Sequence, residues 1–534
     1  MIRILTLSLF VLITVLSYGQ TLQPQIIPQP QELEMGKGIL VLNKKMTISC
    51  PYDNIRTEAE YLQKSLEEKI NYNFKITKGI DRSNQIILIE KKDLCETEYR
   101  IDVTNKIIIC EAGSPEGIFY AIQTLLQSID NKDGKFLIPS MKIKDSPRFA
   151  WRGMMLDDSR HFFGKDVVKQ ILDVMAYLKM NRFHMHLTDE PAWRIEIKKY
   201  PRLTEVGSTG NWHDKSAPQL FYTQEDIKEI VAYAAERHIM VIPEIDMPGH
   251  ATAASRAYPE ISGGGTGRWE GFTFHPAKET TYQFLDDVLT EIAELFPAPY
   301  IHIGGDEVHY GNQIWFTDPV IQNFIKENDL KDEVGMEHYF IRRIADIVNS
   351  KGKKMIGWDE MIASGVTPNK AVIMWWRHDR PAQLTLALDK GFDVIMTPRI
   401  PCYFDFVQDN TQKIGRRWGD GKYNTLETVY NFPGSIENLI KNNQKQIMGM
   451  QASTWTERIA DTQRLYYMIF PRLAAISEDA WTNNEGKNYP TFVEKIKKFY
   501  QFLDIKGINY FNIFDIESTP EPWGPNKADV IAEG

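Results

Sequence analysis

Hydrophobic and polar positions follow two different patterns along this chain, and the change falls near residue 146. In the first part, short aliphatic and β-branched runs predict strands, and apolar residues at helical spacing predict amphipathic helices. The predicted strands cover residues 39–42, 46–48, 85–89 and 107–109, and the predicted helices cover residues 57–69 and 115–129. This part of the chain is therefore expected to form a small α+β domain.

Beyond Asp145-Ser146-Pro147-Arg148 the pattern becomes strand then helix, repeated. Predicted strands cover residues 154–156, 183–187, 240–245, 300–303, 354–356, 372–374, 394–396 and 447–451. Predicted helices cover residues 165–179, 282–296, 336–348, 381–388 and 464–481, and one more helix opens at Thr223 with Asp226 in a capping-box arrangement. Strands that alternate with helices form a parallel sheet, and eight of them fit a (β/α)8 TIM barrel, with a doubly wound open sheet as the alternative.

The first residues have the pattern of a secretory signal. Arg3 is followed by an apolar run over residues 4–16 and by the small residues Ser17 and Gly19, after which cleavage is expected. An uncleaved membrane anchor is the alternative, but the run is shorter than the ~20 residues that a spanning helix needs. We therefore expect an exported protein, periplasmic or extracellular, with no integral membrane span in its mature form.

These patterns divide the chain into four parts. They are a signal peptide (residues 1–19), an N-terminal α+β domain (20–145), a (β/α)8 catalytic domain (146–485), and a C-terminal helix and tail that pack on the barrel (486–534).

Composition narrows the classes of partner and of site. The net charge of −9 over 534 residues, with no long Lys/Arg run, argues against nucleic acid as a partner. The cysteines lack metal-type spacing and are too few for a disulfide framework, so buried free thiols are the favoured interpretation and a single disulfide is the alternative. They are Cys50, Cys95, Cys110 and Cys402.

Polar and aromatic side chains recur where each predicted barrel strand ends. In a (β/α)8 barrel the carboxyl ends of all strands meet at one mouth, which is where active sites lie. In chain order these residues are Asp157, Asp158, Ser159, Arg160, His161, His184, His186, Asp189, Glu190, Glu244, Asp246, His250, Asp306, Glu307, Trp358, Asp359, Glu360, Trp375, Trp376, Arg377, Tyr403, Asp405, Trp455 and Glu457. So many convergent polar groups are hard to explain as packing.

Gly304-Gly305-Asp306-Glu307 is the most prominent of these strand ends. The two glycines let the backbone leave the strand in conformations that other residues resist. Two adjacent carboxylates in a cleft repel each other, and like charge with desolvation can raise the pKa of one of them. A solvated loop with two ordinary acids is the alternative interpretation of this stretch alone.

Two chemistries compete for the mouth. His184 and His186 project from the same side of a strand and could ligate a metal ion, as in a metal-dependent amide hydrolase. However, no second histidine pair or bridging lysine is evident, and tryptophans with carboxylates describe a carbohydrate pocket better. Glycosidases normally place two carboxyls on either side of the scissile bond. Consecutive residues such as Asp306 and Glu307 are poorly placed to reach opposite sides of a scissile bond. A mechanism in which one residue is the acid, the other assists it, and the substrate supplies the nucleophile fits them better.

Six sequence motifs are similar to those of the family 20 glycoside hydrolases, the β-N-acetylhexosaminidases. They are Arg152-Gly153-Met154-Met155-Leu156-Asp157, His186-Leu187-Thr188-Asp189, Pro243-Glu244-Ile245-Asp246-Met247-Pro248-Gly249-His250, His302-Ile303-Gly304-Gly305-Asp306-Glu307, Gly357-Trp358-Asp359-Glu360 and Trp455-Thr456-Glu457. The resemblance runs in order from about residue 27 to 481. It implies a small α+β domain before a (β/α)8 barrel, as the pattern predicts.

The resemblance implies retaining, substrate-assisted hydrolysis of terminal β-linked N-acetylglucosamine (GlcNAc) or N-acetylgalactosamine (GalNAc) through an oxazolinium intermediate. Glu307 corresponds to the general acid/base, and Asp306 to the residue that orients the acetamido group. Tyr403 corresponds to a hydrogen-bond donor to the acetamido oxygen. No cofactor or metal is implied, and the partner is a glycan. A relative with another leaving-group or disaccharide specificity, or a non-catalytic sugar-binding relative, is the alternative.

Further residues correspond to the family's sugar pocket. Trp358, Trp376 and Trp455 resemble its walls, although the pattern does not separate Trp376 from Trp375. The resemblance assigns the sugar's outer hydroxyls to Arg160, Asp405 and Glu457. It assigns the support of the acid/base to the pair Asp189 and His250, which His186 is expected to join. This chain departs from many relatives at residues 190–194, and segments 263–274 and 401–421 are where leaving-group recognition is expected to vary. The natural glycan and the oligomeric state stay open.

Overall fold

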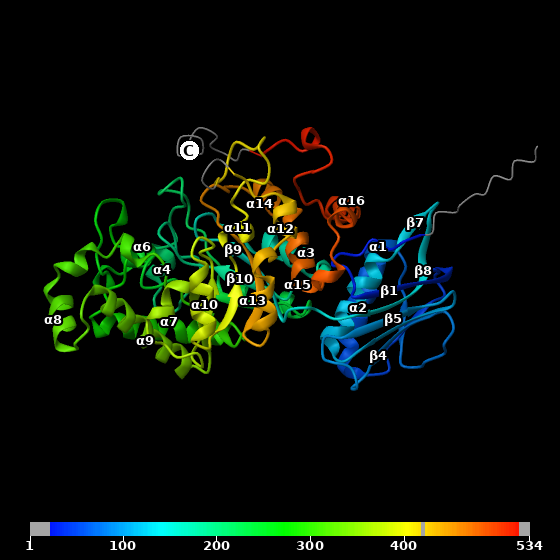
Figure 1. Ribbon diagram of the computed structural model, residues 1–534, viewed down its shortest axis with the longest axis horizontal. Helices are drawn as coiled ribbons and strands as arrows, with labels where there is room; N and C mark the ends of the chain where they lie inside the picture. The colour runs from blue at the N-terminus through cyan, green and yellow to red at the C-terminus, as the bar shows by residue number, and fades with distance from the viewer. Residues whose placement is uncertain (1–21, 418–421, 523–534) are drawn as a thin grey trace, which may run out of the picture.

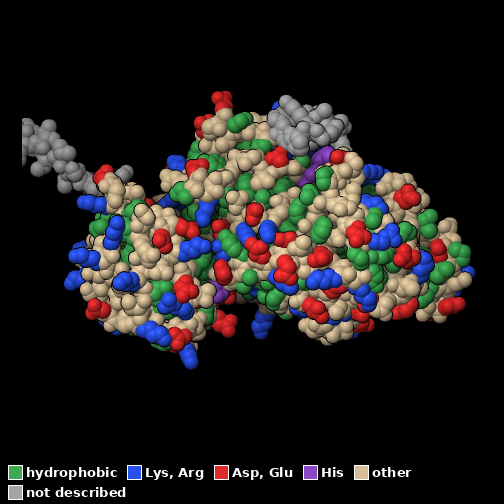
Figure 2. Space-filling view, turned by 180° about the vertical axis from the view of Figure 1, so that it is seen from behind, with side chains coloured by type: hydrophobic (Ala, Val, Ile, Leu, Met, Phe, Trp, Pro, Cys, Tyr) green, Lys and Arg blue, Asp and Glu red, His purple; other side chains and the backbone are tan. Residues whose placement is uncertain are grey.

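The computed structural model describes residues 22–417 and 422–522 of the chain. The predicted signal peptide therefore lies outside the described residues, as do part of the loop 401–421 and the end of the C-terminal tail. Among the described residues, no helix is both long and apolar enough to cross a membrane. Side chains of both charges are interspersed over the face seen in Figure 2.

The N-terminal domain is an eight-stranded sheet with strand order β1-β8-β5-β6-β4-β2-β3, and β7 pairs with β8. Its strands are β1 (Glu32–Val41), β2 (Thr47–Ser49), β3 (Lys75–Thr77), β4 (Gln85–Glu90), β5 (Tyr99–Val103), β6 (Ile107–Ala112), β7 (Asp130–Lys132) and β8 (Lys135–Asp145). Helices α1 (Arg56–Ile70) and α2 (Pro115–Gln127) lie between this sheet and the rest of the molecule (Figure 1).

Four strands of this sheet, β3, β5, β7 and β8, were not predicted, and the two longest of them, β5 and β8, show why. In β5 exposed or half-buried residues alternate with buried ones, and in β8 the charged residues Lys142 and Lys144 interrupt the apolar positions. This alternation is typical of a strand with one solvated face, whereas the prediction relied on continuous apolar runs.

The predicted (β/α)8 barrel is confirmed, and the doubly wound alternative is wrong. Eight parallel strands close in the order β9 to β16, with β16 pairing back onto β9. They are β9 (Trp151–Asp157), β10 (Arg182–His186), β11 (Met240–Glu244), β12 (Tyr300–His302), β13 (Lys354–Trp358), β14 (Ala371–Trp375), β15 (Asp393–Met396) and β16 (Ile447–Thr454).

Helices surround the barrel, and smaller ones are inserted in its loops. They are α3 (Lys165–Tyr177), α4 (Arg202–Glu205), α5 (Gln224–Ala235), α6 (Thr252–Ala257), α7 (Glu279–Leu295), α8 (Pro319–Glu327), α9 (Glu333–Ser350), α10 (Pro381–Asp389), α11 (Arg399–Cys402), α12 (Leu426–Tyr430), α13 (Glu437–Asn442), α14 (Thr462–Ile469) and α15 (Arg472–Trp481). Helix α5 begins with the predicted capping box between Thr223 and Asp226.

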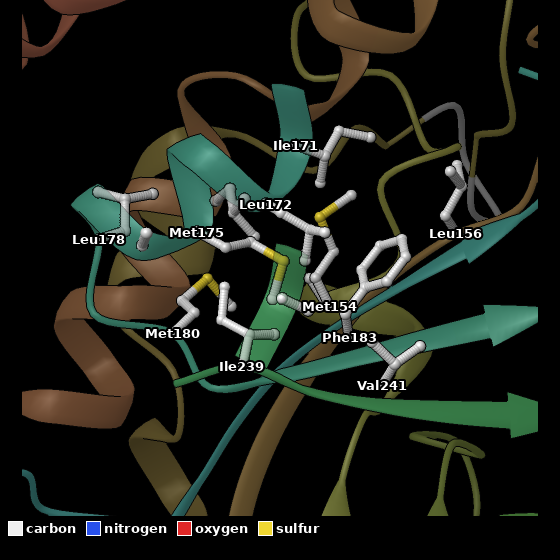
Figure 3. Packing of buried hydrophobic residues seen from close by; sticks show 14 of the residues in the cluster. Met154, Leu156, Ile171, Leu172, Met175, Leu178, Met180, Phe183, Ile239 and Val241 are labelled. Atoms are coloured by element: carbon white, nitrogen blue, oxygen red, sulfur yellow. The ribbon is translucent and has the colours of Figure 1, made fainter. Parts of the chain in front are cut away.

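The helix α3 shows how the barrel is covered. Its buried face carries Ile171 and Met175, which pack over Met154 of β9 and Phe183 of β10 (Figure 3). Burying one such side chain contributes about 1.5–3 kcal/mol to the free energy of folding, so these buried residues together fix the helix on the strands. The strand ends at the mouth are thereby held in place.

One predicted helix is wrong as a continuous element. Residues 464–481 form two helices, because α14 ends at Ile469 and α15 begins at Arg472, with Pro471 between them. Proline lacks the N–H that would continue the hydrogen-bond ladder and its ring clashes with the preceding turn. The last helix, α16 (Tyr489–Lys506), packs beside α3, with the Phe502 ring stacked on Tyr177 at 4.1 Å.

All four cysteines are free thiols, and three of them are buried. Cys95 is exposed, in contrast to the prediction of buried thiols.

Candidate active site

The carboxyl ends of the barrel strands surround a cavity of about 520 Å³. Of the predicted site residues, the cavity is lined by Arg160, Asp189, His250, Asp306, Glu307, Trp358, Trp376, Tyr403, Trp455 and Glu457. Asp405 and His186 do not line it, but each contacts a residue that does. The structure thus brings together side chains from loops that are far apart in the sequence.

The two central carboxyls leave β12 through a strained turn. Gly304 and Gly305 have φ values of 68° and 90°, and a Cβ on Gly304 would lie 1.8 Å from Asp246 Oδ1, so only glycine fits there. Glu307 itself has φ 53°, a left-handed conformation that costs a non-glycine residue about 1–3 kcal/mol. Such strain is typical of functional positions.

The two carboxyls of the turn have different environments. The side chain of Asp306 is 12% exposed and that of Glu307 is 32% exposed. Burial, with a further contribution from the Glu307 charge, raises the pKa of Asp306 to about 8, although His250 opposes the shift. Burial and the neighbouring Asp306 raise the pKa of Asp246 well above its usual range. Asp306 and Asp246 therefore form a buried acid pair, and Glu307 stands apart from it near the mouth.

His250 lies between this pair and Asp189. Its Nδ1 donates to Asp189 Oδ1 at 2.9 Å, and its Nε2 lies 3.6 Å from Asp306 Oδ2 and 3.8 Å from Glu307 Oε2. Burial alone would lower the pKa of His250, but the surrounding carboxylates, Asp189 foremost, raise it well above its usual range. The imidazole is therefore a cation that faces both central carboxyls.

Aromatic rings form the walls of the cavity. The rings of Trp376 and Tyr403 are nearly parallel, 9° apart with centroids at 6.4 Å, and Trp455 lies 6.0 Å from both Tyr403 and Trp358. Trp376 Nε1 donates to Glu360 Oε2 at 2.9 Å, which fixes the indole. Trp375 packs in the hydrophobic core instead, so the structure separates the two tryptophans that the sequence pattern left unresolved.

Arg416 is a site residue that the sequence analysis missed. Its Nη2 lies 2.5 Å from Glu457 Oε1, and its Nε lies 3.2 Å from Asp405 Oδ2. Burial raises the pKa of Asp405 to about 7 although Arg416 opposes the shift, whereas Arg416 and Arg160 outweigh burial and lower the pKa of Glu457. The only signal in the sequence was the Arg416-Arg417 pair in the loop after Tyr403.

The histidines considered as metal ligands lie beneath the cavity. His184 and His186 are fully buried and both contact Glu244, at 3.0 and 2.6 Å. Several sets of three side chains are close enough together to share a cation: His184, Glu244 and His302; His186, Asp189 and Asp246; Asp189, Glu190 and His250; Asp246, His250 and Asp306. Hydrogen bonds between imidazole and carboxylate join His186 to Asp189 in the second set and His250 to Asp189 in the third.

Comparisons with known proteins agree over most of the chain. Residues 149–484 match the family described as "Glycosyl hydrolase family 20, catalytic domain", and residues 23–146 match "Glycosyl hydrolase family 20, domain 2". A beta-hexosaminidase of Vibrio furnissii is 36% identical over 471 residues, which are 85% of this chain and 76% of that protein.

Two further relatives cover nearly the whole chain. A beta-hexosaminidase of Porphyromonas gingivalis is 36% identical over 91% of this chain, which spans only 64% of that relative's length. The crystal structure of a GH20 exo beta-N-acetylglucosaminidase from Vibrio harveyi in complex with N-acetylglucosamine superimposes with a TM-score of 0.83. It is 33% identical and covers 92% of this chain and 78% of its own.

Proposed function

The chain belongs to glycosyl hydrolase family 20, and on that premise we propose that it is an exo-acting β-N-acetylhexosaminidase that releases terminal β-linked GlcNAc or GalNAc. The observation that carries the proposal is the asymmetry of the two consecutive carboxyls. Glu307 lies towards the mouth, where a leaving group would lie, and Asp306 lies deeper, within the aromatic walls.

The proposed mechanism is retaining and substrate-assisted. The carbonyl oxygen of the 2-acetamido group attacks C1 while Glu307 donates its proton to the departing glycosidic oxygen, which gives an oxazolinium ion. Glu307, now a carboxylate, then takes a proton from water as that water attacks C1, and the acetamido group is restored. The nucleophile belongs to the substrate, so a second carboxylate on the opposite face of the sugar is not needed.

Asp306 is proposed to accept the acetamido N–H and to stabilise the positive charge that develops on the nitrogen. Its buried partner Asp246 supports this role. Burial and mutual repulsion raise the pKa of both Asp246 and Asp306, and we propose that the pair holds one proton, which Asp246 carries when the substrate is bound. Asp306 is then left as the hydrogen-bond acceptor.

The remaining cavity residues fit a terminal sugar. The indoles of Trp358, Trp376 and Trp455 offer apolar faces to the ring and to the acetamido methyl group. The tyrosine Tyr403 is proposed to donate to the acetamido oxygen. Arg160 and Glu457, which line the cavity, and Asp405, which lies beside it against Arg416, are proposed to supply charged partners for the outer hydroxyls.

A turnover assay with aryl β-GlcNAc and β-GalNAc, run with and without a chelator, tests the activity. We expect hydrolysis with chelator present, and the first product anomer, followed by NMR, should be β. Loss of activity on chelation would support the metal-dependent alternative. Binding without turnover would support the non-catalytic sugar-binding alternative.

A second measurement tests substrate assistance. Fluorine on the acetamido methyl group withdraws electrons from the carbonyl oxygen and weakens it as a nucleophile. We expect kcat/KM to fall with each added fluorine, and a rate that is insensitive to fluorination would contradict the mechanism.

Export is also proposed, on the basis of Arg3 and the apolar run 4–16. Mass spectrometry of the protein purified from its natural host should give Gln20 as the first residue.

A further inference from the structure

Three histidines and one carboxylate form a second cluster in the barrel interior, deeper than the proposed acid/base Glu307. Glu244, at the end of β11, receives contacts from three imidazoles, at 3.0 Å from His184 Nε2, 2.6 Å from His186 Nδ1 and 2.8 Å from His302 Nδ1. All four side chains are completely buried. The strand register places His186 directly beside Glu244, so the contact is built into the barrel.

His186 differs from its neighbour His184 in what its two ring nitrogens face. His184 Nδ1 accepts from the Gln451 amide at 3.0 Å, and Trp151 Nε1 donates to Gln451 Oε1 at 3.2 Å, which fixes the orientation of that amide. His184 is therefore neutral, with its proton on Nε2, and burial lowers its pKa to about 4. Both nitrogens of His186 face carboxylates, because its Nε2 lies 2.7 Å from Asp189 Oδ2. Two N–H donors are needed, so His186 is an imidazolium.

The electrostatics around His186 agree with this assignment. Burial alone would lower the pKa of His186, but Glu244 and Asp189 raise it well above its usual range. The other charged groups around it are Arg160, whose Nη1 lies 3.4 Å from Nε2, and the nearby carboxyls of Asp157 and Asp246.

Asp189 joins this cluster to the active site. Besides His186, it accepts from Arg160 Nη1 at 2.5 Å, from His250 Nδ1 at 2.9 Å and from the backbone N–H of Glu190 at 2.7 Å. His250 in turn faces Asp306 and Glu307. A continuous series of charged contacts thus runs from the barrel interior to the proposed acid/base.

We propose that His186 is a positioning residue for the proton transfers of Glu307. Held as a cation between Glu244 and Asp189, it keeps Asp189 ionised and oriented towards His250, and through them it sets the pH range in which the acid/base works. His186 touches neither sugar nor leaving group. The inference rests on the proposed function, and Glu244 has no role in it apart from holding the His186 proton.

His186→Gln is the first test, because glutamine can place a neutral N–H near the position of Nε2. Removing one positive charge makes the buried cluster more negative, so its acids hold their protons to higher pH. We expect both limbs of the kcat/KM profile to move up by about one pH unit. We also expect kcat to fall about 10–100-fold while KM changes less than threefold.

Glu244→Gln should move the profile in the same direction but by less, because His186 loses its second proton while the negative charge of Glu244 is lost with it. The double variant His186→Gln/Glu244→Gln should lose no more kcat than His186→Gln alone, since both substitutions act through the same proton. Gln451→Met is the matched control: it disturbs the same interior and His184, so it should lower the melting temperature and leave the pH profile unchanged.

Histidine NMR of the wild-type protein gives an independent readout that needs no variant to remain active. At pH 8 we expect two rings with both nitrogens protonated, those of His186 and His250. The signals of one ring should disappear in His186→Gln or, should that variant not fold, in His186→Asn. A neutral His186, or a His186→Gln enzyme with the wild-type pH profile, overturns the inference. Failure of the wild-type enzyme to hydrolyse aryl β-GlcNAc would instead overturn the proposed function, and the NMR result would still stand.

Discussion

Two buried clusters of charged side chains can be compared in this molecule, one at the cavity and one at the junction of the two domains. At the junction, Asp145 is surrounded by donors: Gln31 N, Ser146 N and Trp481 Nε1, each at 3.0 Å, together with the Tyr99 hydroxyl and Lys179 Nζ. Lys179 also lies over the Trp481 ring, 4.5 Å from its centroid.

The cavity cluster is buried less completely than the junction cluster, and its hydrogen bonds are incomplete. Within the described residues, several buried atoms there have no hydrogen-bond partner: Asp246 Oδ1, Asp306 Oδ1, His250 Nε2, Glu457 Oε2 and both oxygens of Asp405. The backbone is left-handed at His250 and Glu307, with φ values of 54° and 53°, and also at Lys179 of the junction, with φ 56°. Burial of charge and a left-handed backbone are therefore common to both clusters, whereas unused hydrogen-bonding capacity distinguishes the one that is proposed to bind a ligand.

Glu307→Gln tests whether the cavity cluster carries the catalytic function, and it is expected to have the largest effect. Loss of the transferable proton should reduce kcat/KM for substrates with poor leaving groups by about 10²–10⁴-fold, and for activated aryl glycosides by less. The melting temperature should not fall, since Glu307 completes no saturated network. Glu225→Gln, an exposed exchange of the same kind, serves as the control. An unchanged rate with a natural disaccharide would mean that the acid is another residue.

Asp145→Asn tests whether the junction cluster serves stability rather than activity. It leaves the fully buried Lys179 without its charged partner, which should lower the free energy of unfolding by about 3–5 kcal/mol. Activity per folded molecule should stay at the wild-type level, because the junction contacts no cavity residue through Asp145. Adding Lys179→Met should restore part of the stability. A loss of kcat at unchanged stability would show that the two clusters are not separable in this way.

Asp306→Asn separates the roles of the two cavity carboxyls. The amide cannot stabilise the charge on the acetamido nitrogen, so kcat should fall about 10²–10³-fold for all leaving groups alike. This uniform loss contrasts with Glu307→Gln, whose effect depends on the leaving group. If the two variants responded to the leaving group in the same way, the asymmetric assignment would be wrong.

The barrel and most of its mouth could be predicted because their signals are local. Most strands contain a short apolar run, and the strand ends carry residues such as Asp306 or Trp358 that mark them as candidate site positions. The distinction between Trp375 and Trp376 was not local, because a strand buried on both faces gives no polar alternation that shows which side chain faces the cavity.

Contacts that depend on strand register or on the course of a loop could not be predicted from the sequence. The contact of His186 with Glu244 depends on the pairing of β10 with β11, although both residues stand in recognisable motifs. Arg416 reaches Asp405 and Glu457 only because its loop returns over the mouth, and neither spacing nor periodicity indicates that course.

Arg416→Ala is expected to have the smallest effect, and it tests whether the incomplete hydrogen bonds of the cavity are tuned by a charge at its edge. Without the guanidinium, Asp405 faces Glu457 without a counter-charge, so the pKa of Asp405 should rise further above about 7. At neutral pH Asp405 would then be protonated more often and would accept less readily from a sugar hydroxyl. We expect KM to rise about tenfold near pH 7, with little change in kcat, and to recover partly above pH 8 as Asp405 ionises. Arg416→Lys, which keeps the charge, should lie between the alanine variant and the wild type. A KM that does not change in either variant would mean that Arg416 pairs with the two carboxylates only when the site is empty.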